Sequence, residues 1–441
     1  MGNVQLLLRQ HVGAPCAAIV KVGDKVEKGT LIATPTGLGA NIHSSVYGEV
    51  VEVLEDRIII KPDEEQPDAF VKIKEGTPLE MIKEAGLVGM GGAGFPTGVK
   101  LDTKIPGGAF LVNAAECETG LVHNVRQIEE DFARTLRGLK YAMEITEAAK
   151  GIFAIKAKNE KAVAVIREAI KDEPNIFIHL LADIYPSGEE RAVIRECLGV
   201  TLGVDKLPSA ANAAVANVET LLRITEAIED RKPCFSKNLT VIGHLNDGNK
   251  PHVYFDVPVG TSVGELIEKS SGIEEPYGEI ILGGPFTGKP TTVDTPITKT
   301  TGGIVVTMEF MDLHQAPTGI LICACSGNEE RMRDVVSKYN GKVCSVTMCK
   351  QAVEMKSGAL KCEDPGNCPG QAEKVLKMKK DGAEYIVIGN CSDCSNTVMG
   401  SAPKMGLKVI HQTDHVMRTI GHAIYRKLRI SKQVPQLPNG K

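Results

Sequence analysis

The first fifty residues alternate short apolar runs with glycine-containing turns. Valine and isoleucine pairs in residues 18–53 are separated by Gly-Asp and Lys-Gly dipeptides. This pattern predicts short antiparallel strands joined by tight turns. The acidic, proline-containing stretch 61–70 then interrupts the pattern. We therefore interpret residues 1–75 as a small β module.

Longer apolar strands and helical periodicities follow in alternation. The runs 109–115 and 176–185 are typical of buried strands, whereas residues 190–199 carry apolar side chains at helical spacing. Such alternation predicts an α/β layer structure for residues 76–235.

Two further regions complete the chain, which we expect to be a multidomain α/β protein. Residues 236–315 contain strand-like runs around one helical stretch at 261–272. From 316 to 441 the predicted order is strand, helix, strand, helix, strand, strand and helix, with the last helix over 415–428. That order favours a small parallel sheet covered by helices.

Length and charge narrow the class of protein. The 441 residues are 42% apolar, enough for several buried cores, and the net charge of −4 comes without a basic stripe. A nucleic-acid partner is therefore not expected. No apolar run approaches the roughly 20 residues of a membrane-spanning helix, and the start lacks the pattern of a signal peptide. We expect a cytoplasmic protein.

The segment from Gly89 to Leu101, GMGGAGFPTGVKL, carries the densest chemical signal. Glycines lack the Cβ atoms that would keep backbone N–H groups away from a phosphate or a ring edge, so a close ligand is predicted. The loop fits neither the dinucleotide GxGxxG fingerprint nor the Walker loop. Judged by glycine content alone, a mobile surface loop is the alternative interpretation.

Three more motifs follow in order: NAAECETG at 113–120, YPSGEERAVI at 185–194 and ANVETL at 216–221. Together with the glycine loop they resemble the FMN- and NADH-binding subunit of respiratory complex I and the C subunit of the Rnf electron-transport complex. The resemblance implies FMN as cofactor and NADH as electron donor. It also implies a barrel-sandwich hybrid at 1–75, a Rossmann-like FMN/NADH domain at 76–235 and a β-grasp SLBB domain at 236–315.

The resemblance assigns roles to individual residues. Backbone at four glycines would close on FMN, Phe95 would stack near the rings, and Lys100 would offset phosphate or flavin charge. Asn113, Glu116 and Glu118 would place acceptors beside ribityl or ribose hydroxyls, and the YPSGEE motif would form the opposite wall. Asn217 and Thr220 would supply side-chain hydrogen bonds to the phosphate end. For each carboxylate, a solvated or helix-capping charge is the alternative. Besides Phe95 and Lys100, the implied site residues are Gly89, Gly91, Gly92, Gly94, Asn113, Glu116, Glu118, Tyr185, Gly188, Glu189, Glu190, Asn217 and Thr220.

Two positions depart from the complex I pattern. Met90 stands where that subunit has an arginine, and Ala115 where it has an aspartate. The Rnf subunit shares the apolar residue and the Glu-Cys-Glu triplet, so the chain resembles it more. The N-terminal module is also similar to biotinyl and lipoyl carriers, but its stretch TGLGANIHSS has no lysine to modify.

Eight of the twelve cysteines lie after residue 320. The ferredoxin pattern CxxCxxCxxxCP of the Rnf subunit does not occur. Because several of these cysteines follow predicted parallel strands, whose carboxyl ends share one edge, we expect three pairs to converge there. Cys391 and Cys394 should also lie where a helix begins, which lowers a thiol pKa. The pairs are Cys323 with Cys325, Cys344 with Cys349, and Cys391 with Cys394; Cys362 and Cys368 form a fourth pair in sequence.

Three interpretations of this cluster remain open. Cys323, Cys325, Cys391 and Cys394 could cycle between dithiol and disulfide as a redox relay. An iron–sulfur cluster or a zinc ion could instead use Cys344, Cys349, Cys362 and Cys368 as ligands. The third interpretation is inert thiols, which is also our expectation for the scattered Cys16, Cys197 and Cys234.

The sequence as a whole indicates an NADH-oxidising flavoprotein that passes electrons through FMN and C-terminal cysteines to a partner reductase. An Rnf-like body ending in such a cysteine-rich domain resembles the proline reductase-associated electron transfer proteins of amino-acid-fermenting anaerobes. That resemblance implies D-proline reductase as the partner. The alternatives are an Rnf-like subunit of a membrane-associated electron-transport complex and a non-catalytic nucleotide-binding scaffold.

Overall fold

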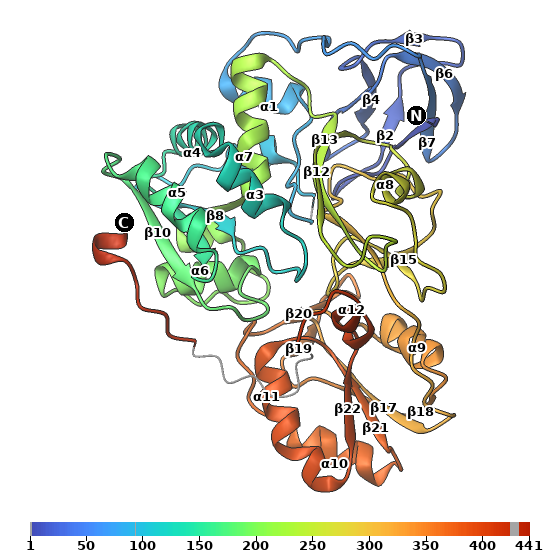
Figure 1. Ribbon diagram of the computed structural model, residues 1–441. Helices are drawn as coiled ribbons and strands as arrows, with labels where there is room; N and C mark the ends of the chain where they lie inside the picture. The colour runs from blue at the N-terminus through green and yellow to red at the C-terminus, as the bar shows by residue number, and fades with distance from the viewer. Residues whose placement is uncertain (1, 93, 424–431) are drawn as a thin grey trace.

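The computed structural model describes residues 2–92, 94–423 and 432–441. Figure 1 shows the N-terminal β module and a mixed sheet on one side, a helix-covered parallel sheet beside them, and a second α/β unit at the opposite end. The chain is therefore a mixed α/β protein with several sheets, as predicted.

Antiparallel strands form the N-terminal module. One sheet has the order β1-β7-β6-β3 and the other the order β2-β4-β5. Alternating side chains such as Leu6, Ile32 and Ile58 point between the sheets and are fully buried. The strands are β1 (Val4–Leu7), β2 (Cys16–Ala18), β3 (Lys25–Val26), β4 (Leu31–Pro35), β5 (Ile42–His43), β6 (Gly48–Val53) and β7 (Arg57–Pro62).

A parallel four-stranded sheet with the order β10-β9-β8-β11 follows. The strand β8 lies between β9 and β11, so the order in which the strands are added to the sheet reverses between β8 and β11. Open α/β sheets bind ligands at such a reversal, at the carboxyl ends of the strands. The strands are β8 (Ala109–Ala114), β9 (Lys150–Lys156), β10 (Ile176–Leu181) and β11 (Ala213–Asn217).

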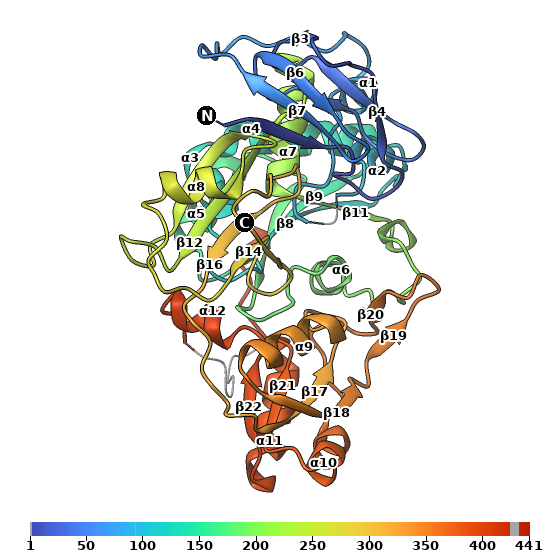
Figure 2. The same ribbon diagram turned by 90° about the vertical axis from the view of Figure 1, so that its right-hand side faces the viewer.

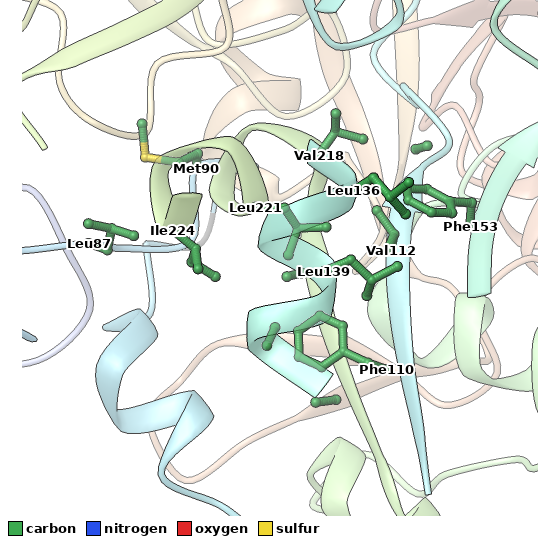
Figure 3. Close-up of a cluster of buried hydrophobic side chains, with 14 of the residues drawn as sticks. Leu87, Met90, Phe110, Val112, Leu136, Leu139, Phe153, Val218, Leu221 and Ile224 are labelled. Atoms are coloured by element: carbon green, nitrogen blue, oxygen red, sulfur yellow. The ribbon is translucent and has the colours of Figure 1, made fainter. Parts of the chain in front are cut away.

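Helices cover both faces of this sheet, and Figure 3 shows the core beneath two of them. Leu136 and Leu139 of one helix meet Leu221 of another above Phe110, and all four are buried. A Cβ at Gly138 would lie 1.9 Å from the Leu221 carbonyl oxygen, so only glycine permits this close crossing. The helices are α1 (Pro78–Glu84), α2 (Thr97–Leu101), α3 (His123–Glu130), α4 (Phe132–Thr146), α5 (Glu160–Ile170), α6 (Glu190–Leu198) and α7 (Val218–Thr225).

The next region is a mixed sheet, β13-β12-β16-β14-β15, with one helix against it. Lys299 of this region is fully buried, and its Nζ donates to the carbonyls of Asn41 (2.6 Å) and Gly86 (2.7 Å). One side chain thus joins three regions of the chain. The elements are β12 (Ser236–Gly243), β13 (His252–Pro258), α8 (Val263–Lys269), β14 (Ile280–Leu282), β15 (Lys289–Thr291) and β16 (Gly303–Val306).

The last region is a second parallel sheet, β18-β17-β21-β22, and confirms the predicted alternation. Two features were not predicted, a hairpin of β19 and β20 and the length of α11. The helix predicted over 415–428 is shorter than expected: it ends at Thr419, two residues before Gly421, whose φ is +66°. Residues 424–428 of the predicted range lie outside the described residues. The elements are β17 (Pro317–Ile322), α9 (Glu329–Lys338), β18 (Lys342–Met348), β19 (Ala352–Glu354), β20 (Leu360–Cys362), α10 (Ala372–Lys380), β21 (Tyr385–Ile388), α11 (Ser392–Ser401), β22 (Lys408–His411) and α12 (Asp414–Thr419).

Figure 2 shows the hairpin of β19 and β20 on the side of the C-terminal unit that faces helix α6. The described C-terminal residues also return to the first parallel sheet, where the Gln436 side chain bonds both backbone groups of Leu180. Within the described part of the chain, no helix is long and apolar enough to cross a membrane.

Candidate functional site

A cavity of about 670 Å³ opens at the carboxyl ends of β8 and β11. The glycine loop, the Glu-Cys-Glu triplet and the YPSGEE segment line it from the first parallel sheet, and residues 283–287 and 300–302 contribute from the mixed sheet. Its remaining wall comes from the C-terminal region and includes Cys325 and Cys362. The cavity therefore lies where three regions of the chain meet.

Two backbone N–H groups of the glycine loop hold it in place, one by a bond within the loop and one by a bond to helix α7. Gly89 N donates to Phe95 O (2.9 Å), and Met90 N donates to the Thr220 hydroxyl (3.0 Å). A Cβ at Gly91 would lie 3.0 Å from the Asn217 Cβ, and Gly92 adopts a φ of +117°. Both positions favour glycine, and both line the cavity.

Ten of the fifteen predicted cofactor-binding residues line the cavity. They are Gly91, Gly92, Asn113, Glu116, Glu118, Tyr185, Gly188, Glu189, Glu190 and Asn217. The other five predicted residues, Gly89, Gly94, Phe95, Lys100 and Thr220, do not belong to the lining.

Lys100 and Thr220 bond to groups of the protein. The Lys100 Nζ donates to the Val215 carbonyl (2.8 Å) and lies 3.3 Å from Glu190 Oε1. The Thr220 hydroxyl accepts the Met90 N–H, as described above. In this structure both side chains position the walls of the cavity.

Two carboxyls of the triplet have different surroundings. Burial raises the pKa of Glu116 to about 7, although the carboxylate accepts the Asn124 N–H at 3.2 Å. Glu118 accepts the backbone N–H groups of Phe286 (2.7 Å) and Thr287 (3.1 Å), and burial raises its pKa too. Glu118 thus anchors the mixed-sheet wall, whereas Glu116 can change its charge near neutral pH.

The opposite wall is built on helix caps and one amide. Asn113 Nδ2 donates to Gly188 O (2.8 Å), and Gly188 N lies 2.7 Å from the Cys117 sulfur. Glu189 caps α6 by accepting the N–H of Arg191 (2.8 Å), so the capping alternative holds for this carboxylate. Asn217 caps α7 in the same way through the N–H of Glu219 (2.8 Å).

Sequence reasoning missed two buried side chains of the lining. His123 bonds the Thr240 hydroxyl at 3.2 Å, and burial holds its pKa well below the usual range, so the imidazole is neutral. Arg191 donates through Nη2 to the Cys362 carbonyl (2.7 Å), while its Nη1 is buried and has no hydrogen-bond partner in the part of the chain that the structure describes. Arg191 directly follows the YPSGEE motif in the sequence, and this position could have identified it as a residue of the site.

Seven cysteines gather at the carboxyl edge of the C-terminal sheet. The Cys325 thiol contacts the thiols of Cys362 and Cys391. Gln371 Nε2 donates to the sulfurs of Cys349 (3.2 Å) and Cys368 (3.3 Å). Cys323 and Cys394 are buried beside this group.

The expectation that Cys344 and Cys349 converge does not hold. Cys344 is the third residue of β18 and is exposed, so it lies near the amino end of the strand, beside Asp381. Cys362 and Cys368 join the cluster in its place because the hairpin of β19 and β20 folds toward the cavity.

The thiols differ in how readily they ionise. A hydrogen bond from the Cys325 thiol lowers the pKa of Cys391 to about 7, and backbone N–H groups at the start of α11 act in the same direction. The predicted placement of Cys391 at a helix start is confirmed. The Cys325 thiol also lowers the pKa of Cys362, and the pKa of Cys325 itself is raised. Among the described residues, no group of three or more His, Cys, Asp or Glu side chains is arranged to hold a metal ion.

Comparisons with known proteins agree with the resemblance. Residues 82–226 match the Nuo51 FMN-binding domain, and residues 2–74 match the RnfC barrel sandwich hybrid domain. The chain therefore contains an FMN-binding domain of the Nuo51 type behind a barrel-sandwich module.

Two kinds of protein are among the relatives of this chain. Cobalamin reductase PduS of Salmonella typhimurium is 38% identical over 228 residues, 52% of this chain and 49% of that protein, so this chain spans only about half of its length. The C subunit of the proton-translocating ferredoxin:NAD(+) oxidoreductase complex of Clostridium ljungdahlii is 32% identical, over 69% of this chain and 70% of that subunit. The C subunit of the Na(+)-translocating complex of Acetobacterium woodii is 29% identical, over 72% and 76%.

Proposed function

The chain belongs to the family of the C subunits of ion-translocating ferredoxin:NAD(+) oxidoreductase complexes, and from this premise we propose that it is an NADH-oxidising flavoprotein. FMN binds in the cavity, NADH donates electrons, and the C-terminal cysteines pass them to a partner reductase. When bound, FMN accepts a hydride and releases electrons singly or in pairs. The observation that carries the proposal is that one cavity is lined by both the glycine loop and Cys325 and Cys362.

The residues of the cavity fit a flavin mononucleotide. Gly91 and Gly92 leave backbone open to a close ligand. The volume of about 670 Å³ falls within the roughly 300–1,000 Å³ of small-molecule sites. The buried Arg191 Nη1 is a donor without an acceptor among the described residues, and a ligand or an anion in the cavity would satisfy it.

We assign tasks to several residues of the cavity. Asn113 and Glu116 accept from ligand hydroxyls, and the N-terminus of α7 behind Asn217 faces the phosphate end. Glu118 and Tyr185 keep the walls from the mixed sheet and the C-terminal region in contact with the first sheet.

We assign the partner as D-proline reductase and the location as the cytoplasm, with an SLBB domain at 236–315 and a cysteine-rich redox domain at 316–441. The support is the resemblance of the Rnf-like body and its cysteine-rich end to proteins that serve that reductase. A second candidate is a subunit of a membrane-associated ion-translocating complex, and the extent of similarity to the Clostridium ljungdahlii subunit favours it.

The test of the proposed function is an anaerobic NADH titration of FMN-reconstituted protein. An NADH oxidoreductase loses the visible absorbance of its flavin, whereas a non-catalytic scaffold keeps its FMN oxidised under excess NADH. Adding purified D-proline reductase or ferredoxin to the reduced protein then distinguishes the two candidates by which one reoxidises the flavin.

A further inference from the structure

Of the eight described cysteines after residue 320, only Cys325 and Cys362 line the cavity. The other cysteines of the CxC and CxxC motifs are buried inside the C-terminal region: Cys323 is 6% exposed, Cys391 7% and Cys394 4%. A pairing within the CxxC motif would therefore leave the redox pair behind the wall of the cavity, and a pairing within the CxC motif would bring only Cys325 to it. The two thiols that face the cofactor come from different segments.

The thiols of Cys325 and Cys362 are already in contact. Each takes part in a hydrogen bond with the other, and Cys391 is the second neighbour of Cys325. Neighbouring thiols can join as a disulfide once their Cβ atoms approach to about 3.5–4.5 Å.

Both cysteine carbonyls accept hydrogen bonds from the region of the first parallel sheet. The Tyr185 hydroxyl donates to Cys325 O (2.6 Å), and Arg191 Nη2 donates to Cys362 O (2.7 Å). Arg195 Nη1 also donates to the carbonyl of Pro365 (2.9 Å). The pair is thus fixed relative to the cavity, and a fixed distance is what electron delivery from a bound cofactor requires.

The two thiols are not equivalent. Cys362 is half-buried and lies near the Arg191 guanidinium, which lowers its pKa in addition to the hydrogen bond from Cys325. Cys325 is half-buried too, so the neighbouring cation is what distinguishes the two thiols. The thiol beside a cation has more thiolate character and is the attacking member of a dithiol, and the other thiol is the resolving member.

We propose that Cys325 and Cys362 form the redox disulfide that receives electrons at the cavity, with Cys362 as the thiol that attacks the partner. This inference rests on the proposed function for its electron source. Two electrons break the Sγ–Sγ bond, and with two protons they leave two thiols. NADH supplies the electron pair and one proton as hydride, and solvent supplies the other proton. Reoxidation occurs by exchange with a disulfide of the partner protein, which takes up both electrons.

The test maps disulfides in the full chain. Protein oxidised with diamide is alkylated, digested without reductant and analysed by mass spectrometry. A cross-link between the Cys325 and Cys362 peptides is expected, and NADH should open it when FMN is bound. Cys362→Ser should lose this cross-link and take up one NADH equivalent fewer per oxidised chain. The exposed Cys344→Ser is the matched control and should keep both properties.

Two outcomes would overturn the inference. One is a cross-link that maps within the CxC pair, within the CxxC pair or between Cys325 and Cys391. The other is Cys362→Ser that still takes up the full amount of NADH. If the cross-link maps to Cys325 and Cys362 and dithiothreitol opens it while NADH does not, the pair is supported and the proposed electron source fails. If NADH bleaches FMN but the cross-link lies between other cysteines, the proposed NADH oxidation is supported and the Cys325–Cys362 disulfide is contradicted.

Discussion

The Tyr185 hydroxyl donates a 2.6 Å hydrogen bond to the Cys325 carbonyl, which joins the wall of the cavity to the first cysteine of the C-terminal region that lines it. The same ring meets Phe286 edge to face at 4.5 Å between centroids, so it contacts the mixed sheet as well. Tyr185 therefore lies at the junction of all three regions that enclose the cavity.

Tyr185→Phe should keep the ring contact and lose only the hydrogen bond. We expect the free energy of unfolding to fall by about 0.5–1.5 kcal/mol and the NADH-driven reduction of the C-terminal thiols to slow. Chemical denaturation and thiol titration measure the two effects. Tyr277→Phe, at a residue 37% exposed, is the control. Thiol reduction at the wild-type rate in Tyr185→Phe would show that this hydrogen bond does not position Cys325.

Gly92→Val should abolish flavin retention. Its φ of +117° is strained for a β-branched residue, at a cost of about 1–3 kcal/mol, and the position lines the cavity. Gly107 also has a positive φ, +71°, with open space around it and no place in the lining. Gly107→Val therefore introduces backbone strain away from the cavity, and this variant should retain FMN. Equal FMN content in the two variants, measured after gel filtration, would mean that the cavity is not the flavin site.

Glu116 should make the stability of the cofactor-free protein depend on pH. Its pKa rises on folding from 4.5 to about 7 because of burial. Between these values the unfolded chain loses the proton and the folded chain keeps it, so the free energy of unfolding falls as pH rises and levels off above about 7. Glu116→Gln should lack this decline. Denaturant unfolding at several pH values tests it, and parallel curves for wild type and variant would contradict the assignment.

Arg191→Gln should move the ionisation of Cys362 to higher pH. The guanidinium favours the thiolate, so its removal should shift the pH profile of Cys362 alkylation upward, whereas Arg191→Lys should retain part of the effect because it keeps the charge. Alkylation of the Cys344 peptide in the same digests is the internal control. An unchanged Cys362 profile would show that the Arg191 guanidinium does not lower the pKa of this thiol.

Much of the fold follows from the sequence. Alternating Val and Ile at short intervals predicted the N-terminal strands, and separate apolar runs with helical stretches between them predicted both parallel sheets. Local patterns determine these features, because strand and helix periodicities are visible within a few residues.

The pairing of distant segments could not be predicted in this way. Cys362 reaches Cys325 only because a hairpin with little apolar periodicity folds over the edge of the sheet. Cys344 has motif-like spacing to Cys349, yet strand register places the two at opposite ends of β18. The motifs identified most of the cavity lining, but whether Lys100 or Arg191 faces the ligand depends on tertiary contacts such as the one between Lys100 and Val215.

The central claim is that electrons from NADH reach the C-terminal thiols through bound FMN. Titratable thiols are counted in anaerobic, diamide-oxidised full-length protein after NADH is added, with and without FMN, and metal content is measured on anaerobically purified protein without diamide treatment. The account predicts that thiols appear in pairs only when FMN is present, in protein without stoichiometric iron or zinc. A thiol count that does not change while the flavin is bleached, or several irons per chain with broad visible absorption, would contradict it.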